Sequence, residues 1–278
     1  MNSKLLAYLE LMRPLNVAIT FASILAACFL AGSGESTWLP AVIASFVGAF
    51  VAAGANAIND YFDIEIDRIN KPERPLARGA LQPRDAYGLW LVLTLVGILL
   101  NVFLNSTALA IAVFASIALY VYSAKLKRTV LIGNVLVGVM TGVAFVYGAV
   151  AVGKPERSIV PALFAFLINV AREIVKDVED IDGDARNAAI TLPVKHGVKP
   201  SLTLATVILL TLIGTTFVPY LIGMYNALYL ALALVVDIVL LFVIASMWKN
   251  STSKNLGRLS FLLKLSMPIG LVGIYFGS

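Results

Sequence analysis

The feature that most constrains the fold is a series of apolar stretches, each long enough to cross a lipid bilayer. A transmembrane helix needs about 20 mostly apolar residues. The 278-residue chain is 60% hydrophobic and only 13% charged, with a mean hydropathy of +0.90, which is far from the composition of a soluble domain. We therefore predict an all-α integral membrane protein with nine transmembrane helices in one bundle. The predicted spans are residues 14–32, 38–60, 86–104, 106–124, 129–151, 158–176, 200–221, 224–247 and 259–277.

The basic residues predict how these spans are oriented. With nine spans, all 21 lysines and arginines except Lys154 and Arg157 fall on the side of the membrane that holds the N-terminus. Lysine and arginine accumulate in cytoplasmic loops. We therefore expect a multi-pass protein of the cell membrane with a cytoplasmic N-terminus and a C-terminus on the opposite face.

An acidic motif follows the second span. Asn56, Asp60, Asp63 and Asp67 have the spacing N-x3-D-x2-D-x3-D. On an α-helix, positions 0, 4, 7 and 11 fall within about 60° of one another. The motif therefore predicts a stripe of oxygen-bearing side chains at the cytoplasmic end of the span.

The same spacing recurs after the sixth span, in Glu173, Asp177, Asp180 and Asp184. Four further spans return the chain to the same face of the membrane, so both motifs are expected on the cytoplasmic side. This predicts a parallel four-helix pseudo-repeat, unlike the inverted repeats common in transporters. Two stripes on one face can converge on a single cavity.

Two groups of carboxylates indicate a metal site. Like charges at short range repel and raise each other's pKa unless cations hold them. Oxygen ligands without histidine or cysteine suit a hard ion, above all Mg²⁺, which shares its shell with substrate phosphates. A solvated helix end paired with neighbouring lysines and arginines is the alternative, and the repeated spacing argues against it. The predicted ligands of two or more Mg²⁺ ions are Asn56, Asp60, Asp63, Asp67, Asp177, Asp180 and Asp184.

Basic side chains on the same face are candidates for binding phosphate oxygens. Arg74, Lys125 and Lys127 lie in the cytoplasmic loops, where they also serve orientation. Tyr122 precedes Lys125 by three residues at the end of a span, so a phenol and an ammonium can act on one face of a helix.

These motifs resemble those of the UbiA family of intramembrane prenyltransferases. The family has an NDxxDxxxD motif after its second helix and a DxxxD motif after its sixth. It also has a Tyr-x-x-Lys element between helices four and five, and an Arg-Pro near the start of helix one. The matching residues are Asn59, Asp60, Asp63 and Asp67 in the first motif, Asp180 and Asp184 in the second, Tyr122 with Lys125, and Arg13 with Pro14.

The resemblance covers essentially the whole chain and implies Mg²⁺-dependent transfer from a prenyl diphosphate donor. The second motif is most similar to the archaeal branch, in which a geranylgeranyl group passes to the free hydroxyl of geranylgeranylglyceryl phosphate. In that reading Asp60, Asp63, Asp67, Asp180 and Asp184 are catalytic. The acceptor's phosphate needs a further basic contact, for which the candidates are Arg13, Lys71, Arg74 and Lys264. Asn16 either hydrogen-bonds the acceptor or makes a contact between helices.

Other functions stay open at this point. An aromatic acceptor, as in quinone biosynthesis, is the alternative within the enzyme class. A divalent-cation transporter is a second possibility, although it predicts acids at the middle of the bilayer, where only Asp237 lies. A lipid-binding scaffold without turnover is a third. We expect a single transmembrane domain over residues 1–278 with motif loops at 56–84 and 173–199, lipid-like partners, no nucleic acid and no obligate protein partner.

Two polar residues inside spans are expected to have structural roles. Asn134 lies beside Gly133 and before Gly138, which predicts an interhelical hydrogen bond at a close crossing. Asp237 lies in the middle of the eighth span, so we expect it to be a neutral acid or to be paired with a group such as Lys264.

Overall fold

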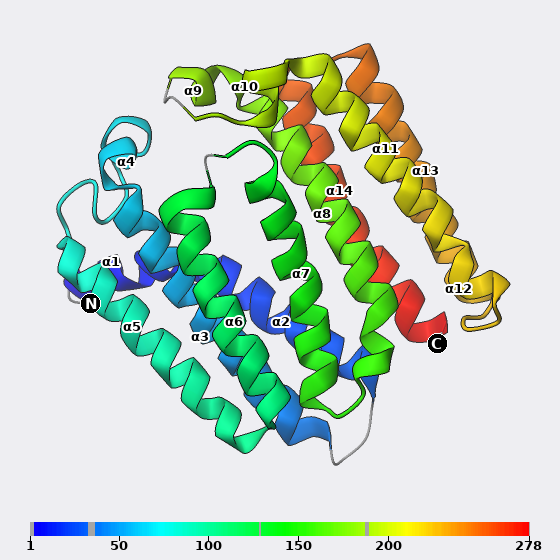
Figure 1. The fold of residues 1–278 in the computed structure, drawn as a ribbon, viewed down its shortest axis with the longest axis horizontal. Helices are drawn as coiled ribbons and strands as arrows, with labels where there is room; N and C mark the ends of the chain where they lie inside the picture. Colours follow the sequence, from blue (N-terminus) through cyan, green and yellow to red (C-terminus); the bar gives the residue numbers. More distant parts are fainter. Residues whose placement is uncertain (1–2, 33–36, 128, 187–188, 278) are drawn as a thin grey trace. The chain divides into compact units, whose positions relative to one another are not determined.

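The computed structural model describes residues 3–32, 37–127, 129–186 and 189–277, and the regular structure in these ranges is helical. Short 3-10 turns cover Asn101–Phe103 and Pro155–Ser158, and a π-helical turn covers Tyr122–Leu126. Figure 1 labels the α-helices along the chain. They are α1 (Ser3–Met12), α2 (Pro14–Ala31), α3 (Trp38–Phe62), α4 (Ile64–Asn70), α5 (Pro83–Leu100), α6 (Ser106–Val121), α7 (Ile132–Ala151), α8 (Ile159–Glu179), α9 (Ile181–Arg186), α10 (Leu192–His196), α11 (Val198–Thr216), α12 (Val218–Leu221), α13 (Ala227–Lys249) and α14 (Ser253–Gly277).

Nine helical segments in the described ranges are long and apolar enough to cross a membrane, which confirms the predicted spans. Prolines and capping side chains mark where several of these helices begin. Pro14 and Pro83 stand in the first turns of α2 and α5, where the missing N–H costs nothing. Asn105 caps α6 through a bond from the Ala108 amide at 2.8 Å, and this cap separates the third and fourth spans.

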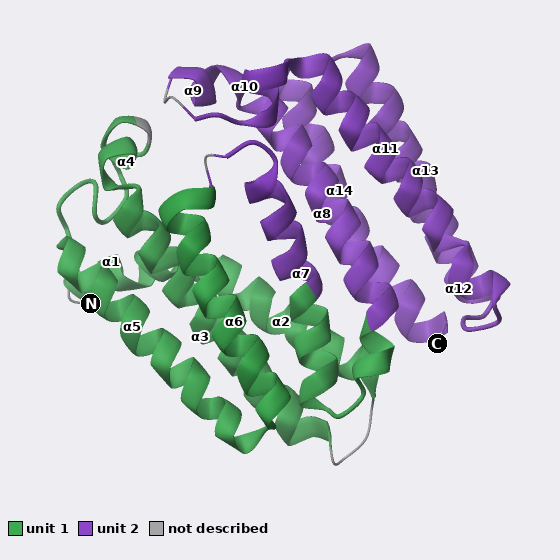
Figure 2. Ribbon diagram, viewed as in Figure 1, with its two compact units in different colours: residues 1–126, 143–158 green, residues 127–142, 159–278 purple. Residues whose placement is uncertain are grey.

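The chain forms two compact units, each with its own core (Figure 2). Unit 1 comprises residues 1–126 and 143–158, and unit 2 comprises residues 127–142 and 159–278. The start of α7 belongs to unit 2 and its end to unit 1. Whether the chain acts as a single domain stays a prediction.

Unit 1 is built around α3, which packs against α1, α2, α5 and α6. Small residues allow these helices to approach closely. A Cβ added at Gly48 would lie 2.0 Å from Cδ1 of Ile24 on α2, and one at Gly54 would lie 3.3 Å from the carbonyl oxygen of Trp90 on α5. The C-terminal end of α3 packs with α1 and α5, where Ala7, Leu11 and Ala57 are fully buried.

Unit 2 packs α8 against α11 and α14, and α13 against α11 and α14. Its core is a leucine- and valine-rich cluster that includes Ile174, Leu209, Leu240 and Leu263, each fully buried. The first half of α7 lies against α8 at Gly138 and Gly142. A Cβ at Gly142 would lie 2.9 Å from the carbonyl oxygen of Ala162, so the two backbones touch at this point.

The predicted pseudo-repeat is visible in the backbone. In unit 1, α3 continues through Asp63 into the short helix α4; in unit 2, α8 continues through Asp180 into the short helix α9. The Asp63 amide donates to Asn59 O (3.1 Å) and the Asp67 amide to Asp63 O (2.8 Å). At the corresponding positions, the Asp180 amide donates to Lys176 O (2.9 Å) and the Asp184 amide to Asp180 O (2.9 Å). Helical bonding therefore carries each acidic stripe across the break in its helix.

Candidate active site

The first acidic motif is buried at the C-terminal end of α3. Asp60, Asp63 and Asp67 are 2%, 4% and 5% exposed, although they stand at the end of a span and in the short helix after it. These three carboxylates therefore face protein rather than solvent. Carboxylates buried this deeply must be paired with cations or hydrogen-bond donors.

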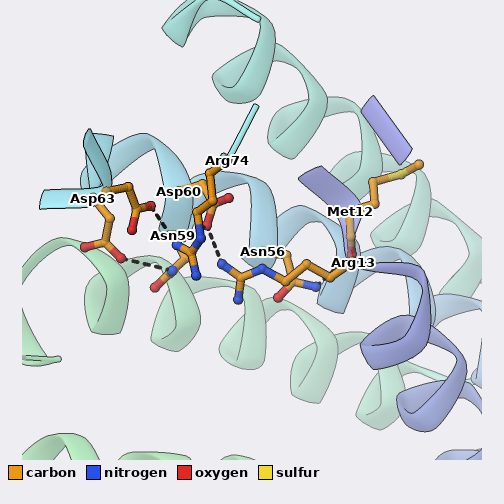
Figure 3. A network of polar contacts seen from close by, with 8 residues as sticks. Met12, Arg13, Asn56, Asn59, Asp60, Asp63 and Arg74 are labelled. Carbon is orange, nitrogen blue, oxygen red and sulfur yellow. Dashed lines mark hydrogen bonds and ion pairs between the residues drawn. The ribbon is translucent and has the colours of Figure 1, made fainter. Parts of the chain in front are cut away.

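Two arginines supply the pairing. Nη1 of Arg74 contacts both Oδ1 of Asp60, at 3.0 Å, and Oδ2 of Asp67, at 2.6 Å. Nη2 of Arg13 forms a second ion pair with the same Oδ1 of Asp60. Figure 3 shows Arg13 and Arg74 reaching this carboxylate from two different segments of the chain. One nitrogen of Arg74 thus lies between two carboxylates, at a point where positive charge is stabilised.

Arg13 reaches Asp60 because the backbone turns sharply between α1 and α2. Its φ of 55° places it in the left-handed region, which is uncommon for a residue other than glycine. The Asn56 side chain fixes this turn by donating from Nδ2 to the carbonyl oxygen of Met12 at 2.8 Å. Asn56 was predicted as a metal ligand, and with its nitrogen engaged in this bond only Oδ1 can serve that role.

Asn59 lies beside the stripe and donates from Nδ2 to Oδ2 of Asp63 at 3.1 Å (Figure 3). This contact orients the third acid of the motif. Lys71 follows α4 and is exposed, and Asn16 is exposed in the first turn of α2. Their predicted roles in binding substrate stay predictions.

Tyr122 and Lys125 lie in the π-helical turn after α6, whereas their predicted alignment assumed an α-helix. A π-turn is wider than an α-turn and shifts the register of its side chains, so the three-residue spacing does not by itself align them. Tyr122 is half-buried, Lys125 is exposed, and the adjacent Lys127 is half-buried. π-Turns within helices are frequent at functional sites. Joint binding of phosphate by these residues stays a prediction.

The second motif is less deeply buried than the first. Asp177 and Asp184 are half-buried, and Asp180 is exposed. Oδ2 of Asp177 accepts a 2.7 Å bond from Nδ2 of Asn134 on α7, which confirms the predicted interhelical role of Asn134. The sequence signal for this contact was an amide inside an apolar span next to small residues, but its partner in the second motif was not predicted.

The acidic side chains of the second motif are only partly balanced by nearby positive charges. Burial raises the pKa of Asp184 above the ordinary value for aspartate, and the negative charge of Asp180 adds to the increase. Glu173 is already neutralised, since it contacts Nη1 of Arg172 at 2.6 Å and Nζ of Lys176 at 3.6 Å. The remaining acids of this stripe therefore favour an additional cation.

The donor set of both motifs fits a hard divalent cation. Within the described ranges no three acidic, histidine or cysteine side chains gather into a ready-made metal cage. Mg²⁺ does not require one, because it usually takes one or two carboxylates and completes its shell with water and substrate phosphates. Asp60 and Asp67 already share one cationic nitrogen, which shows that two of their oxygens can serve one cation. That the two stripes share one cavity stays a prediction.

Asp237 belongs to neither motif and lies in the middle of α13. Its Oδ2 is 2.9 Å from Oγ1 of Thr216, which is also 2.7 Å from the carbonyl oxygen of Ile213. The Thr216 hydroxyl thus donates to Asp237 from the end of α11. Whether the acid is neutral or paired with a group such as Lys264 stays a prediction.

Comparisons with known proteins agree with this architecture. The model of the UbiA prenyltransferase family matches residues 20–266. The digeranylgeranylglyceryl phosphate synthase of Methanopyrus kandleri is 41% identical over 96% of this chain and 97% of its own length, and that of Methanococcus aeolicus is 35% identical over 100% and 99%.

Solved structures agree as well. One from work on the biosynthesis of digeranylgeranylglyceryl phosphate synthase in membranes has a TM-score of 0.86 at 35% identity, covering 99% of this chain and 98% of its own. A UbiA homolog from Archaeoglobus fulgidus bound to GPP and Mg²⁺ has a TM-score of 0.70 at 21% identity, covering 96% and 99%. The second likeness shows the shared fold alone.

Proposed function

This chain belongs to the UbiA prenyltransferase family, and from that premise we propose that it makes an ether lipid of archaeal membranes. The donor is geranylgeranyl diphosphate, and the acceptor is the free hydroxyl of geranylgeranylglyceryl phosphate. The observation that carries the choice of acceptor is the full-length similarity to synthases of digeranylgeranylglyceryl phosphate. The family likewise favours an enzyme over a transporter or a scaffold.

The reaction exchanges one carbon–oxygen bond for another. The bond between the first carbon of the prenyl group and the diphosphate breaks, and the diphosphate leaves with the bonding electrons. The acceptor hydroxyl forms the new ether bond, and its proton passes to a diphosphate oxygen or to a motif carboxylate. Catalysis therefore requires stabilisation of negative charge on the leaving group and exclusion of water from the reacting carbon.

The cationic side chains of unit 1 are suited to the first requirement. Arg74 and Arg13 lie at Asp60, and Lys71 stands three residues before Arg74. Arginine binds phosphate oxygens in a bidentate manner, so these groups would hold the diphosphate or the acceptor's phosphate. Tyr122, Lys125 and Lys127 would add contacts from the segment after α6. Asn16 would hydrogen-bond the acceptor.

Two or more Mg²⁺ ions would be held by Asn56, Asp60, Asp63 and Asp67 in the first motif and by Asp177, Asp180 and Asp184 in the second. When bound, Mg²⁺ neutralises charge on the departing diphosphate. The contribution of the chain is to present carboxylate and amide oxygens at the end of an apolar span, where prenyl chains dissolve and water is scarce. The burial of Asp60, Asp63 and Asp67 supports this arrangement.

The chain is a multi-pass membrane protein, and we place its N-terminus and both motifs in the cytoplasm. The distribution of basic residues supports this orientation, because only Lys154 and Arg157 fall on the other side of a nine-span topology. The C-terminus would then lie on the opposite face.

The test is prenyl transfer by the purified protein in detergent with Mg²⁺ and labelled geranylgeranyl diphosphate. Geranylgeranylglyceryl phosphate and 4-hydroxybenzoate are offered in parallel. We expect an ether product from the first acceptor, lost on addition of EDTA and in Asp60→Asn. Glu65→Gln is the matched control, because it also converts an acid of this segment into an amide, but at a side chain that is 82% exposed.

Three results, two from this assay and one from a separate flux measurement in liposomes, would change the proposed function. Product formed only from 4-hydroxybenzoate would replace the proposed acceptor with an aromatic one. Equal product from wild type and Asp60→Asn would refute catalysis at the first motif. Equal Mg²⁺ flux in liposomes of both proteins, with no transfer to either acceptor, would favour a transport function.

A further inference from the structure

The segment between α4 and α5 carries Arg74, and the structure shows how this segment is held in place. It consists of turns that cover residues 72–81, with Leu76 and Leu81 buried against Ala7 and Leu11 of α1. The segment thus rests on α1, the helix that ends just before Arg13. Both arginines that reach Asp60 therefore depend on the position of α1.

Arg78 makes the polar link between this segment and α1. Its Nη2 contacts Oε2 of Glu10 on α1 at 2.7 Å, and its Nη1 donates to the carbonyl oxygen of Glu73 at 2.6 Å. The backbone amide of Arg78 also donates to the carbonyl oxygen of Arg74 at 2.9 Å. Arg78 thus binds the carbonyls of two successive residues, Glu73 and Arg74, while it is anchored to α1.

The ion pair between Arg78 and Glu10 contributes little to the stability of the fold. The side chains of Arg78 and Glu10 are 39% and 37% exposed, and exposed ion pairs contribute little to stability. The link instead restrains the backbone at Arg74, because Arg78 holds the carbonyl groups of the two peptides that flank this residue. The guanidinium of Arg74, by contrast, is only 18% exposed and contacts two carboxylates of the first motif.

We propose that Glu10 and Arg78 form a clasp that positions Arg74 for diphosphate binding and so makes α1 part of the substrate-binding unit. Neither residue touches the first-motif carboxylates in the structure; each acts through Arg74. The ion pair between Lys4 of α1 and Asp85 of α5, at 3.8 Å, ties the same helix to the far end of the segment. This proposal rests on the proposed function only in that it requires a diphosphate site at Arg74.

The test measures binding of inorganic diphosphate in the presence of Mg²⁺ by calorimetry, with purified protein in detergent. We expect Arg78→Ala to raise Kd about 10-fold, a modest value for a misplaced binding group. Arg78→Lys keeps the charge opposite Glu10 but loses the fork that also holds the Glu73 carbonyl, so we expect an intermediate Kd. The thermal midpoint of both variants should stay within about 3 °C of wild type.

A double-mutant cycle with Arg74→Ala separates positioning from other effects. If Arg78 acts through Arg74, Arg78→Ala has no further effect on Kd in the Arg74→Ala background. Arg68→Gln is the matched control, since it removes an exposed arginine of the same region whose ion pair with Glu65 (2.9 Å) does not reach the motif acids. It should leave Kd unchanged in both backgrounds.

The outcomes distinguish this proposal from the proposed function. A 10-fold effect of Arg78→Ala that persists unchanged without Arg74, or no effect in either background, would overturn the clasp. Wild-type protein that binds diphosphate but transfers no prenyl group would overturn the proposed function and leave the clasp to be decided by the cycle. Wild-type protein that binds no diphosphate with Mg²⁺ would overturn both.

Discussion

Replacing Gly138 by alanine is expected to separate α7 from α8 and to disturb the second acidic motif. A Cβ at this position would lie 2.4 Å from Cγ2 of Val170 and 3.0 Å from the carbonyl oxygen of Phe166, whereas ordinary contacts begin at 3.4 Å. Val170 can change rotamer, but the carbonyl belongs to the backbone. The helices must therefore move apart by about 0.4 Å even when the side chain adapts, because a contact this close is strongly repulsive.

This displacement occurs one helical turn from Asn134, on the same face of α7. The bond from Asn134 to Asp177 is 2.7 Å long, so the same movement stretches it to about 3.1 Å, near the limit for a good hydrogen bond. Overpacking of this kind costs about 1–3 kcal/mol. At 2–4 °C for each kcal/mol, the thermal midpoint falls by about 2–12 °C. The Mg²⁺ concentration for half-maximal transfer should also rise, because Asp177 is a proposed ligand.

The assay is thermal unfolding in detergent, followed by a Mg²⁺ titration of prenyl transfer. Gly214→Ala is the matched control. Gly214 also lies inside a long helix, α11, but a Cβ there meets nothing within 4 Å, so alanine should stabilise the helix by up to about 1 kcal/mol. A Gly138→Ala protein as stable as Gly214→Ala, with an unchanged Mg²⁺ requirement, would refute the close crossing of α7 and α8.

Three further substitutions test individual contacts. Asn134→Ala leaves Asp177 without its donor and should cost about 1–3 kcal/mol in thermal unfolding; no loss would show that the bond is not formed. Arg74→Lys should raise KM for geranylgeranyl diphosphate less than Arg74→Ala does, because lysine keeps the positive charge but lacks the second nitrogen for a bidentate phosphate contact. Arg74→Ala should raise KM at least 10-fold by loss of a phosphate-binding charge, and equal KM for both variants would contradict this role. Asp237→Asn should change stability by less than about 1 kcal/mol, since the amide oxygen of asparagine can accept the bond from Thr216 as Oδ2 of Asp237 does; a large loss would indicate a required charge.

The spans and the acidic stripes could be predicted because they depend on local spacing. A run of about 20 apolar residues has few alternatives to a membrane helix. The spacing shared by the two motifs predicted one stripe of acids in each, and the helical backbone bonds at Asp63 and Asp180 continue across the break in each helix. The helical period survives the break in both units, and this is why a stripe calculated on a continuous helix remains valid.

The contacts that organise the first motif could not be predicted, because they join residues far apart in sequence. Arg78 and Glu10 are separated by 68 positions, and Asn56 and the Met12 carbonyl by 44. Such contacts depend on how α1 packs on α3, and that packing depends on the left-handed turn at Arg13. A residue followed by proline favours an extended conformation, so a positive φ at Arg13 could not be predicted from the Arg-Pro pair. The π-turn at Tyr122 was likewise absent from the α-helical pattern.

The two motifs have the same pattern of backbone hydrogen bonds but differ in how the charge of their carboxylates is balanced. In the first, Asp60 and Asp67 are buried and already paired with arginine, so a metal ion that takes Oδ1 of Asp60 or Oδ2 of Asp67 must displace Arg13 or Arg74 from that oxygen. In the second, Asp180 is exposed and Asp177 has a neutral amide as its partner, so a cation can bind there without displacing another charge. An arginine released from a carboxylate by a metal ion is free to bind a phosphate oxygen. The first motif is therefore the one in which metal binding and diphosphate binding should be coupled, and the clasp on Arg74 acts at the residue that must change partners.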